Sequence, residues 1–89
     1  MKTILIIAGS DSGGGAGIQA DIKTAEYFKV FSTTAITAIT AQNSLGVEAV
    51  FDIPTDFIQK QLDAITKDFK INAVKIGMLS NKDVINLTY

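Results

Sequence analysis

A glycine-rich segment is the part of this sequence best suited to contact a ligand. Residues 8–21 read AGSDSGGGAGIQAD and directly follow the apolar run 4–7. Five of the chain's seven glycines lie within nine positions there, from Gly9 to Gly17. Glycine permits positive φ angles and lets the backbone come close to another molecule. The segment therefore predicts a strand, a turn and the start of a helix, with a ligand beside the turn.

Two known phosphate-binding glycine motifs do not fit this segment. Gly9 and Gly14 have the spacing of a Walker loop, but the Lys and the Ser or Thr that must follow are replaced by Gly15 and Ala16. A dinucleotide fingerprint also fails, because its third glycine would fall on Ile18. The segment therefore binds something other than nucleotide phosphate, or it serves only as a tight turn between a strand and a helix.

The sequence contains neither cysteine nor histidine. Disulfides, thiolate metal sites, cysteine nucleophiles and histidine bases are therefore excluded within these 89 residues. Any chemistry here has to come from carboxylates, amides and the backbone.

Two residues with ligand-binding potential follow expected strands, at the edge where ligands of open parallel sheets bind. The primary amide of Gln42 both donates and accepts hydrogen bonds, which suits a heteroaromatic ring with an amine next to a ring nitrogen. Alternatively, Gln42 and Asn43 satisfy only backbone groups of a turn. Met78 follows a later strand and could pack on a flat ring, or it could belong to the core.

Asp21 lies beside the apolar stripe of the expected first helix, so its carboxylate needs a partner. It could accept a hydrogen bond from a substrate hydroxyl or amine, or it could form an ion pair with Lys23 or Lys75. Lys75 is a charge within an apolar strand, and it therefore either extends its ammonium group to water or has an acidic partner. Asp11, in the glycine-rich segment, is a residue type that forms turns through its side chain.

The composition describes a soluble globular chain, because 47% of the residues are apolar and the net charge is −1. The eight basic residues are all lysines and are scattered singly, so no nucleic-acid-binding face is expected. No apolar run approaches the roughly 18 residues typical of a membrane-spanning helix. We therefore expect a cytoplasmic protein with no nucleic-acid or membrane partner.

Four segments have strand patterns. Runs rich in apolar and β-branched residues indicate buried strands at 3–8, 31–41 and 71–76. Alternation of apolar and polar residues indicates a half-exposed strand at 45–53.

Apolar residues at helical spacing indicate two helices between these strands. The first covers about 15–29, and the second begins at a cap residue, Thr55 or Asp56, and extends to Phe69. A capping box at Ser80 predicts the start of a third helix. This order predicts an α/β fold with helices on both faces of a mostly parallel sheet. Such folds usually need more than about a hundred residues, so we expect the front part of one larger domain.

Four stretches of this sequence, in order, resemble hydroxymethylpyrimidine/phosphomethylpyrimidine kinases of thiamine biosynthesis. Residues 8–23, AGSDSGGGAGIQADIK, resemble the amino-terminal signature of that family. The likeness continues through AITAQNSLGV at 38–47, QKQLDAI at 59–65 and VKIGML at 74–79. The resemblance therefore spans nearly the whole chain.

The resemblance implies a ribokinase-like three-layer α/β fold that is incomplete in this chain, with residues 1–89 as the amino-terminal portion of a single kinase domain. It implies ATP-dependent phosphorylation of 4-amino-5-hydroxymethyl-2-methylpyrimidine and then of its monophosphate. The general base, the anion hole and most of the ATP and Mg²⁺ sites belong to a part of the family's domain that this chain lacks. We therefore expect no catalytic and no metal-binding residue here, and no catalysis from these residues alone.

The resemblance also assigns substrate contacts to positions of this sequence. Gln42 would hold the aminopyrimidine edge, Asp21 and the backbone around Gly9 and Ala16 would line the pocket, and Met78 would pack on the ring. For the complete protein we expect a homodimer. Two other interpretations stay open at this point: a pyridoxal kinase of the same superfamily, and a non-catalytic module that binds a vitamin precursor.

Overall fold

The computed structural model describes residues 2–77, which form four strands and two helices. In chain order they are β1 (Thr3–Ser10), α1 (Gly17–Tyr27), β2 (Phe31–Asn43), β3 (Gly46–Asp52), α2 (Thr55–Asp68) and β4 (Ala73–Ile76). The sequence pattern predicts all six elements in this order. The helix predicted at Ser80 lies outside the described residues.

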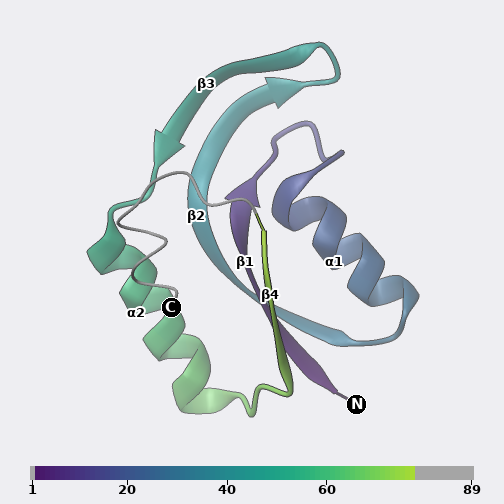
Figure 1. Ribbon diagram of the computed structural model, residues 1–89, viewed down its shortest axis with the longest axis vertical. Coiled ribbons are helices and arrows are strands. Elements are labelled where there is room, and N and C mark those ends of the chain that lie inside the picture. The colour runs from purple at the N-terminus through teal and green to yellow at the C-terminus, as the bar shows by residue number, and fades with distance from the viewer. Residues whose placement is uncertain (1, 78–89) are drawn as a thin grey trace.

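The strands form one sheet in the order β3-β2-β1-β4 (Figure 1). β1 pairs in parallel with both β2 and β4, whereas β3 runs antiparallel to β2. The carboxyl ends of β1, β2 and β4 therefore lie at the same edge of the sheet. The predicted α/β class with a mostly parallel sheet is confirmed.

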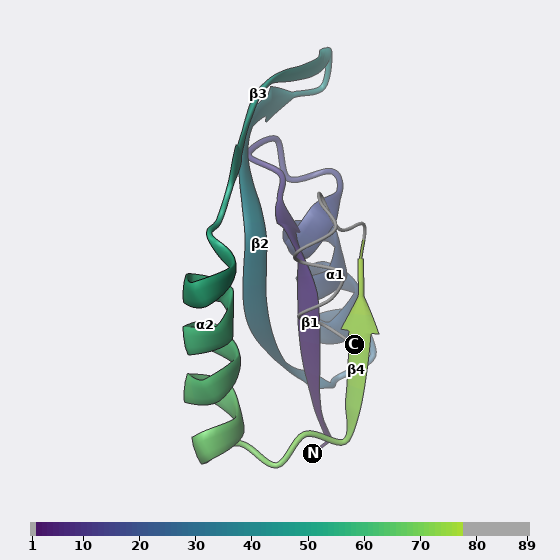
Figure 2. The same cartoon turned by 60° about the vertical axis from the view of Figure 1, so that its left-hand side comes forward.

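The sheet lies between the two helices, with α1 on one face and α2 on the other (Figure 2). Because successive side chains of a strand point to opposite faces, β1 contributes to an apolar cluster on each side. The cluster on the α2 side consists of Leu5, Ile7 and Ala35 with the partly buried Leu62, Ile65 and Ile71. The cluster on the α1 side consists of Ile6, Ala8 and Ile18 with the partly buried Ile4 and Ile36.

Strand burial differs from the prediction at both edges of the sheet. In the part of the chain that the structure describes, every residue of β4 is exposed, although this strand was predicted to be buried. Every residue of β3 is exposed as well, although this strand was predicted to be only half-exposed. Within residues 2–77, each of these strands pairs on one side only, and the two helices pack mainly against β1 and β2. Apolar composition predicts a strand correctly here, but it does not predict the strand's place in the sheet.

The helix ends also differ from the prediction. α1 is shorter than the predicted 15–29 at both ends, because residues 15–16 belong to the glycine-rich loop and residues 28–29 form a turn. The amino-terminal cap of α2 is Pro54 rather than Thr55 or Asp56, and no side chain caps this helix. The carbonyl oxygen of Pro54 instead accepts hydrogen bonds from the N–H groups of the third and fourth residues after it.

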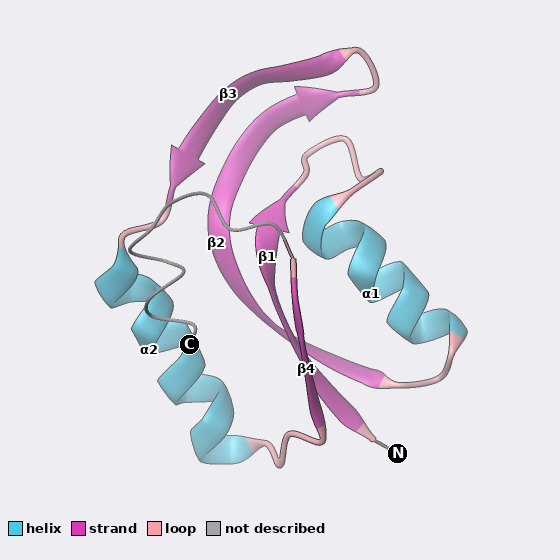
Figure 3. Ribbon diagram, viewed as in Figure 1, coloured by secondary structure: helices cyan, strands magenta, loops and turns pink. Residues whose placement is uncertain are grey.

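β2 is longer than β1 and curves past its end to form a hairpin with β3 (Figure 3). Near the end of β1 the register changes, because Ala8 pairs with Ile36 but Ser10 pairs with Ile39. β2 therefore carries one extra residue there, a β-bulge of the kind that changes the direction of neighbouring side chains. This bulge lies next to the glycine-rich loop.

Candidate functional site

The glycine-rich segment forms a loop around the side chain of Asp11. Its Oδ1 accepts a hydrogen bond from the N–H of Gly13 at 2.8 Å, and its Oδ2 accepts bonds from Gly15 at 3.0 Å and Ala16 at 2.8 Å. The carbonyl oxygen of Asp11 accepts a further bond from the N–H of Gly14 at 2.9 Å. The residue is only 6% exposed. The prediction that Asp11 forms a turn through its side chain is confirmed.

Two glycines of the loop have backbone angles that other residues rarely adopt. The φ angle is +80° at Gly14 and +59° at Gly17. A Cβ atom at Gly17 would also lie 2.5 Å from the carbonyl oxygen of Gly9. The loop therefore needs glycine at position 17 both for its conformation and for its close approach to the end of β1.

The side chain of Gln19, in the first turn of α1, connects the helix to the end of β1. Its Oε1 accepts a hydrogen bond from the N–H of Asp11 at 2.8 Å, and its Nε2 donates to the Oγ of Ser10 at 2.7 Å. From β2, the hydroxyl of Thr40 donates to the carbonyl oxygen of Ser10 at 2.8 Å. Side-chain hydrogen bonds thus hold the loop, α1 and two strands together.

A cavity of about 490 Å³ lies beside this loop, at the carboxyl ends of β1 and β2. Gly77, directly after β4, also borders it. Four of the five residues predicted to contact substrate line this cavity: Gly9, Ala16, Asp21 and Gln42. The fifth, Met78, lies outside the described residues. The cavity is at the sheet edge where ligands of open parallel sheets bind.

Asp21 forms an ion pair through Oδ1 with the Nζ of Lys75 on β4. The Asp21 side chain is 15% exposed and the Lys75 side chain is 58% exposed. Lys23, the other candidate partner, instead donates to the carbonyl oxygen of Gly14 at 3.0 Å. Both members of the ion pair line the cavity. The second carboxylate oxygen of Asp21 makes no hydrogen bond within residues 2–77, so it can accept one from a ligand.

The backbone and the side chain of Gln42 have different surroundings. Its backbone N–H donates to the Oγ of Ser12 at 2.7 Å, and its carbonyl oxygen accepts from the same hydroxyl at 2.6 Å. Its side-chain amide has no hydrogen-bond partner in the part of the chain that the structure describes. The neighbouring Asn43 does stabilise the turn backbone, as one of the two interpretations predicted, because its Oδ1 accepts a hydrogen bond from the N–H of Leu45 at 2.8 Å. The Gln42 amide is therefore available to a ligand in the cavity.

Sequence reasoning missed several residues of β2 and β3 that line the cavity: Thr37, Ala38, Thr40 and Val50. Thr37 is fully buried, and its hydroxyl oxygen has no hydrogen-bond partner within residues 2–77. The β-bulge explains how the consecutive residues Thr37 and Ala38 both border the cavity. The threonines in this otherwise apolar strand could have indicated a polar site. The strand pattern alone, however, does not reveal the β-bulge that turns Thr37 and Ala38 toward the same cavity.

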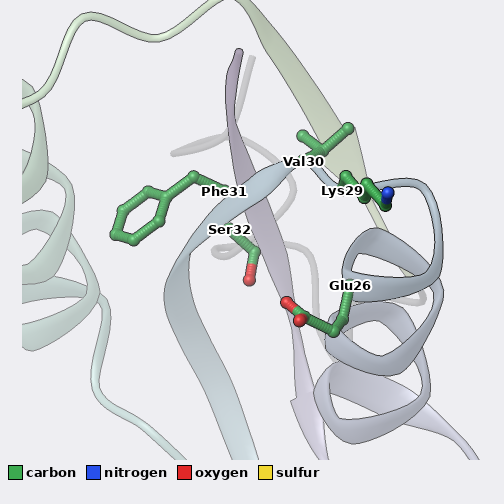
Figure 4. A pocket seen from close by; sticks show the side chains of 5 residues that line it. All are labelled: Glu26, Lys29, Val30, Phe31 and Ser32. Atoms are coloured by element: carbon green, nitrogen blue, oxygen red, sulfur yellow. The ribbon is translucent and has the colours of Figure 1, made fainter. Parts of the chain in front are cut away.

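A second cavity, also of about 490 Å³, lies at the amino end of β2 (Figure 4). It is lined by Glu26, Lys29, Val30, Phe31 and Ser32. In Figure 4 the ring of Phe31 points to the opposite side of the strand from the polar groups of Glu26 and Ser32. This is the edge of the sheet opposite to the glycine-rich loop, so we place the functional site at the first cavity rather than here.

Residues 2–77 contain no group of three or more acidic side chains that could hold a metal ion. Neither α1 nor α2 is long and apolar enough to span a membrane. The first cavity offers hydrogen-bonding groups, the ammonium of Lys75 and the carboxylate of Asp21. Asp11 also borders it, but its two carboxylate oxygens already accept N–H groups of the loop. Such a set can bind and orient a small polar molecule.

The family model described as phosphomethylpyrimidine kinase matches residues 11–89 of this chain. The chain belongs to the phosphomethylpyrimidine kinase family. The resemblance identified from the four sequence stretches is thereby confirmed.

Relatives of this family match nearly the whole chain. A hydroxymethylpyrimidine/phosphomethylpyrimidine kinase of Haemophilus influenzae is 59% identical over 85 residues, which is 96% of this chain and 32% of that protein. The chain thus spans about a third of the length of this curated relative. The crystal structure of phosphomethylpyrimidine kinase from Clostridium difficile 630 is 49% identical, with a TM-score of 0.95 over 99% of this chain and 38% of the other.

A pyridoxal kinase is structurally similar as well. The Bacillus subtilis enzyme, solved as an ADP complex, is 47% identical, with a TM-score of 0.88 over 99% of this chain and 35% of that one. The two similar structures are kinases of the ribokinase-like class, so the ribokinase-like fold expected from the resemblance is confirmed for the part present here.

Proposed function

We propose that the complete protein phosphorylates 4-amino-5-hydroxymethyl-2-methylpyrimidine and then its monophosphate, with ATP, in thiamine biosynthesis. Residues 1–89 form the amino-terminal portion of its single kinase domain and supply part of the substrate-binding site. The observation that carries this proposal is the meeting of Gly9, Ala16, Asp21 and Gln42 on one cavity at the carboxyl edge of the sheet. Family membership supports the reaction class.

In this proposal each lining residue has a distinct task. The amide of Gln42, which has no partner among the described residues, donates to a ring nitrogen and accepts from the amino group of the pyrimidine. The free carboxylate oxygen of Asp21 accepts a hydrogen bond from a substrate donor. The backbone of Gly9 and Ala16 lies against the ring, and Met78 packs on its face.

The reaction needs the substrate held so that its hydroxymethyl oxygen can attack the γ-phosphorus of ATP, with ADP leaving. Phosphoryl transfer depends mostly on such positioning and on stabilisation of charge. The residues lining the cavity contribute positioning. We place the base that removes the hydroxyl proton, and the groups that stabilise the transferred phosphoryl group, outside residues 1–89.

ATP is the proposed phosphoryl donor, and the ADP complex of the Bacillus subtilis pyridoxal kinase supports it. Mg²⁺ accompanies ATP in reactions of this kind. Mg²⁺ is usually held by one or two carboxylates together with phosphate oxygens of the nucleotide, and we place these carboxylates outside residues 1–89. A homodimer and a cytoplasmic location stay predictions for the complete protein.

Pyridoxal kinase is the second candidate function, and the 47% identity to the Bacillus subtilis enzyme is the observation that favours it. The test is steady-state kinetics of the complete protein with ATP and with either hydroxymethylpyrimidine or pyridoxal. We expect a higher kcat/KM for the pyrimidine, and conversion of the monophosphate to the diphosphate. A higher kcat/KM for pyridoxal would assign the second function. Binding of the pyrimidine without any turnover would identify a non-catalytic binding module.

A further inference from the structure

We propose that Asp11 is a positioning residue, whose carboxylate holds the glycine-rich loop in the shape that forms one wall of the substrate cavity. Its two oxygens accept three backbone N–H groups, from Gly13, Gly15 and Ala16, at 2.8 to 3.0 Å. Hydrogen bonds to an ionised acceptor are stronger than those between neutral groups. The side chain of Asp11 therefore holds Gly13, Gly15 and Ala16, while its backbone carbonyl oxygen accepts the N–H of Gly14.

This arrangement explains why a glycine-rich loop between a strand and a helix does not act as a phosphate cradle here. Successive backbone N–H groups that point into one concavity form an anion-binding site. In this loop the anion is already present, because the carboxylate of Asp11 occupies that position. The loop N–H groups at Gly13, Gly15 and Ala16 are thus not available to a nucleotide phosphate.

The same contacts connect Asp11 to the cavity. Ala16, whose N–H bonds Oδ2, lines the cavity and is the residue that precedes α1. The backbone N–H of Asp11 is itself held by Gln19 at 2.8 Å, so the carboxylate is tied to both the loop and the helix. Displacement of Ala16 would move the wall that the substrate ring contacts. Asp11 also borders the cavity, but both of its carboxylate oxygens are already bonded to the loop, so its proposed action on the substrate runs through Ala16.

The kinetic part of the test rests on the proposed function and uses the complete protein. Asp11→Asn keeps the size of the side chain but replaces one acceptor oxygen by a donor, so it cannot accept all three N–H groups. We expect KM for hydroxymethylpyrimidine to rise about 10- to 100-fold, with KM for ATP nearly unchanged. Asp68→Asn, at the exposed end of α2, is the matched control and should leave both KM values unchanged.

Chemical rescue separates positioning from a general loss of structure. Asp11→Gly leaves the three N–H groups without their carboxylate, and added formate should occupy the vacated position and lower KM for the pyrimidine in a saturable way. Chloride at equal ionic strength should have no such effect. The proposal is overturned if Asp11→Asn changes pyrimidine KM by less than about twofold, or if it raises KM for pyrimidine and ATP equally.

A third measurement, hydrogen exchange, tests the role of Asp11 without any substrate. Hydrogen exchange of residues 13–16 should be faster in Asp11→Asn than in the wild-type protein, and formate should slow it in Asp11→Gly. If the complete protein shows no pyrimidine kinase activity but exchange behaves in this way, the proposed function fails and the role of Asp11 stands. If exchange at these residues is unchanged in Asp11→Asn, the role of Asp11 is refuted whatever the activity.

Discussion

Asp21 on α1 and Lys75 on β4 form an ion pair across 54 positions of sequence. The parallel pairing of β1 with β4 brings them together, because it places Lys75 opposite Ile6, next to the strand that α1 covers. The pair connects the helix to the edge strand and forms part of the cavity wall. Asp21 can therefore contact substrate and also be held in place by Lys75.

We expect Lys75→Met to lower the free energy of unfolding of the complete protein by less than about 1 kcal/mol. The Lys75 side chain is 58% exposed, and exposed ion pairs contribute little to stability. Urea unfolding of the two proteins measures the difference. A loss of several kcal/mol would mean that the pair is a major structural support, contrary to this view.

Replacement of Gln42 by alanine should weaken binding of hydroxymethylpyrimidine to the complete protein by about 1 to 3 kcal/mol, the usual cost of leaving buried polar groups without partners. Calorimetric titration with the pyrimidine and with an ATP analogue tests this, and affinity for the ATP analogue should stay nearly constant. Gln59→Ala is the control, because Gln59 lies on the exposed surface of α2, where its side chain donates to Asp63. Wild-type pyrimidine affinity in Gln42→Ala would reduce Gln42 to a turn residue.

The two glycines at positions 14 and 15 should respond differently to valine. Gly14 has a φ of +80°, a conformation that costs an L-residue roughly 1 to 2 kcal/mol, and a branched side chain more. Gly15 has no positive φ, and the nearest atom to a Cβ there is Asp11 Oδ2 at 3.9 Å. Gly14→Val should therefore destabilise the complete protein and raise pyrimidine KM more than Gly15→Val does. Equal effects in unfolding and kinetics would show that backbone conformation is not the determining factor.

Residues 1–89 prepared as an isolated chain should associate rather than unfold as a cooperative monomer. Apolar side chains of both edge strands are exposed, including Val50, Phe51, Val74 and Ile76, and exposed strand edges promote pairing between chains. Sedimentation and thermal unfolding at several concentrations test this expectation. Sharp two-state unfolding with a midpoint independent of concentration would contradict it and would favour a self-contained binding module.

The sequence predicts most of the fold because its local patterns are strong. The apolar run that forms β1 and the helical spacing of α2 place both elements nearly correctly. Burial of β3 and β4 could not be predicted, because it depends on strand order and on where the helices pack. Local pattern contains neither kind of information.

The sequence also predicted several residues that meet at the candidate site, whose contacts with substrate stay a prediction. Gly9, Ala16, Asp21 and Gln42 were assigned through the family resemblance, and the cavity brings them together. The choice between Lys23 and Lys75 as partner of Asp21 required the sheet order. Thr37 was missed because the β-bulge in β2 breaks the alternation on which strand patterns depend.

Hydrogen exchange of the complete protein, with and without saturating 4-amino-5-hydroxymethyl-2-methylpyrimidine, tests the central claim most directly. The proposed site predicts slower exchange on binding in the loop at residues 9–17 and near Gln42, with no change at residues 26–32. The second cavity thus serves as an internal control, since it is equal in volume and lies at the opposite edge of the sheet. Slower exchange at residues 26–32 without any change at 9–17 would contradict the assignment of the substrate site.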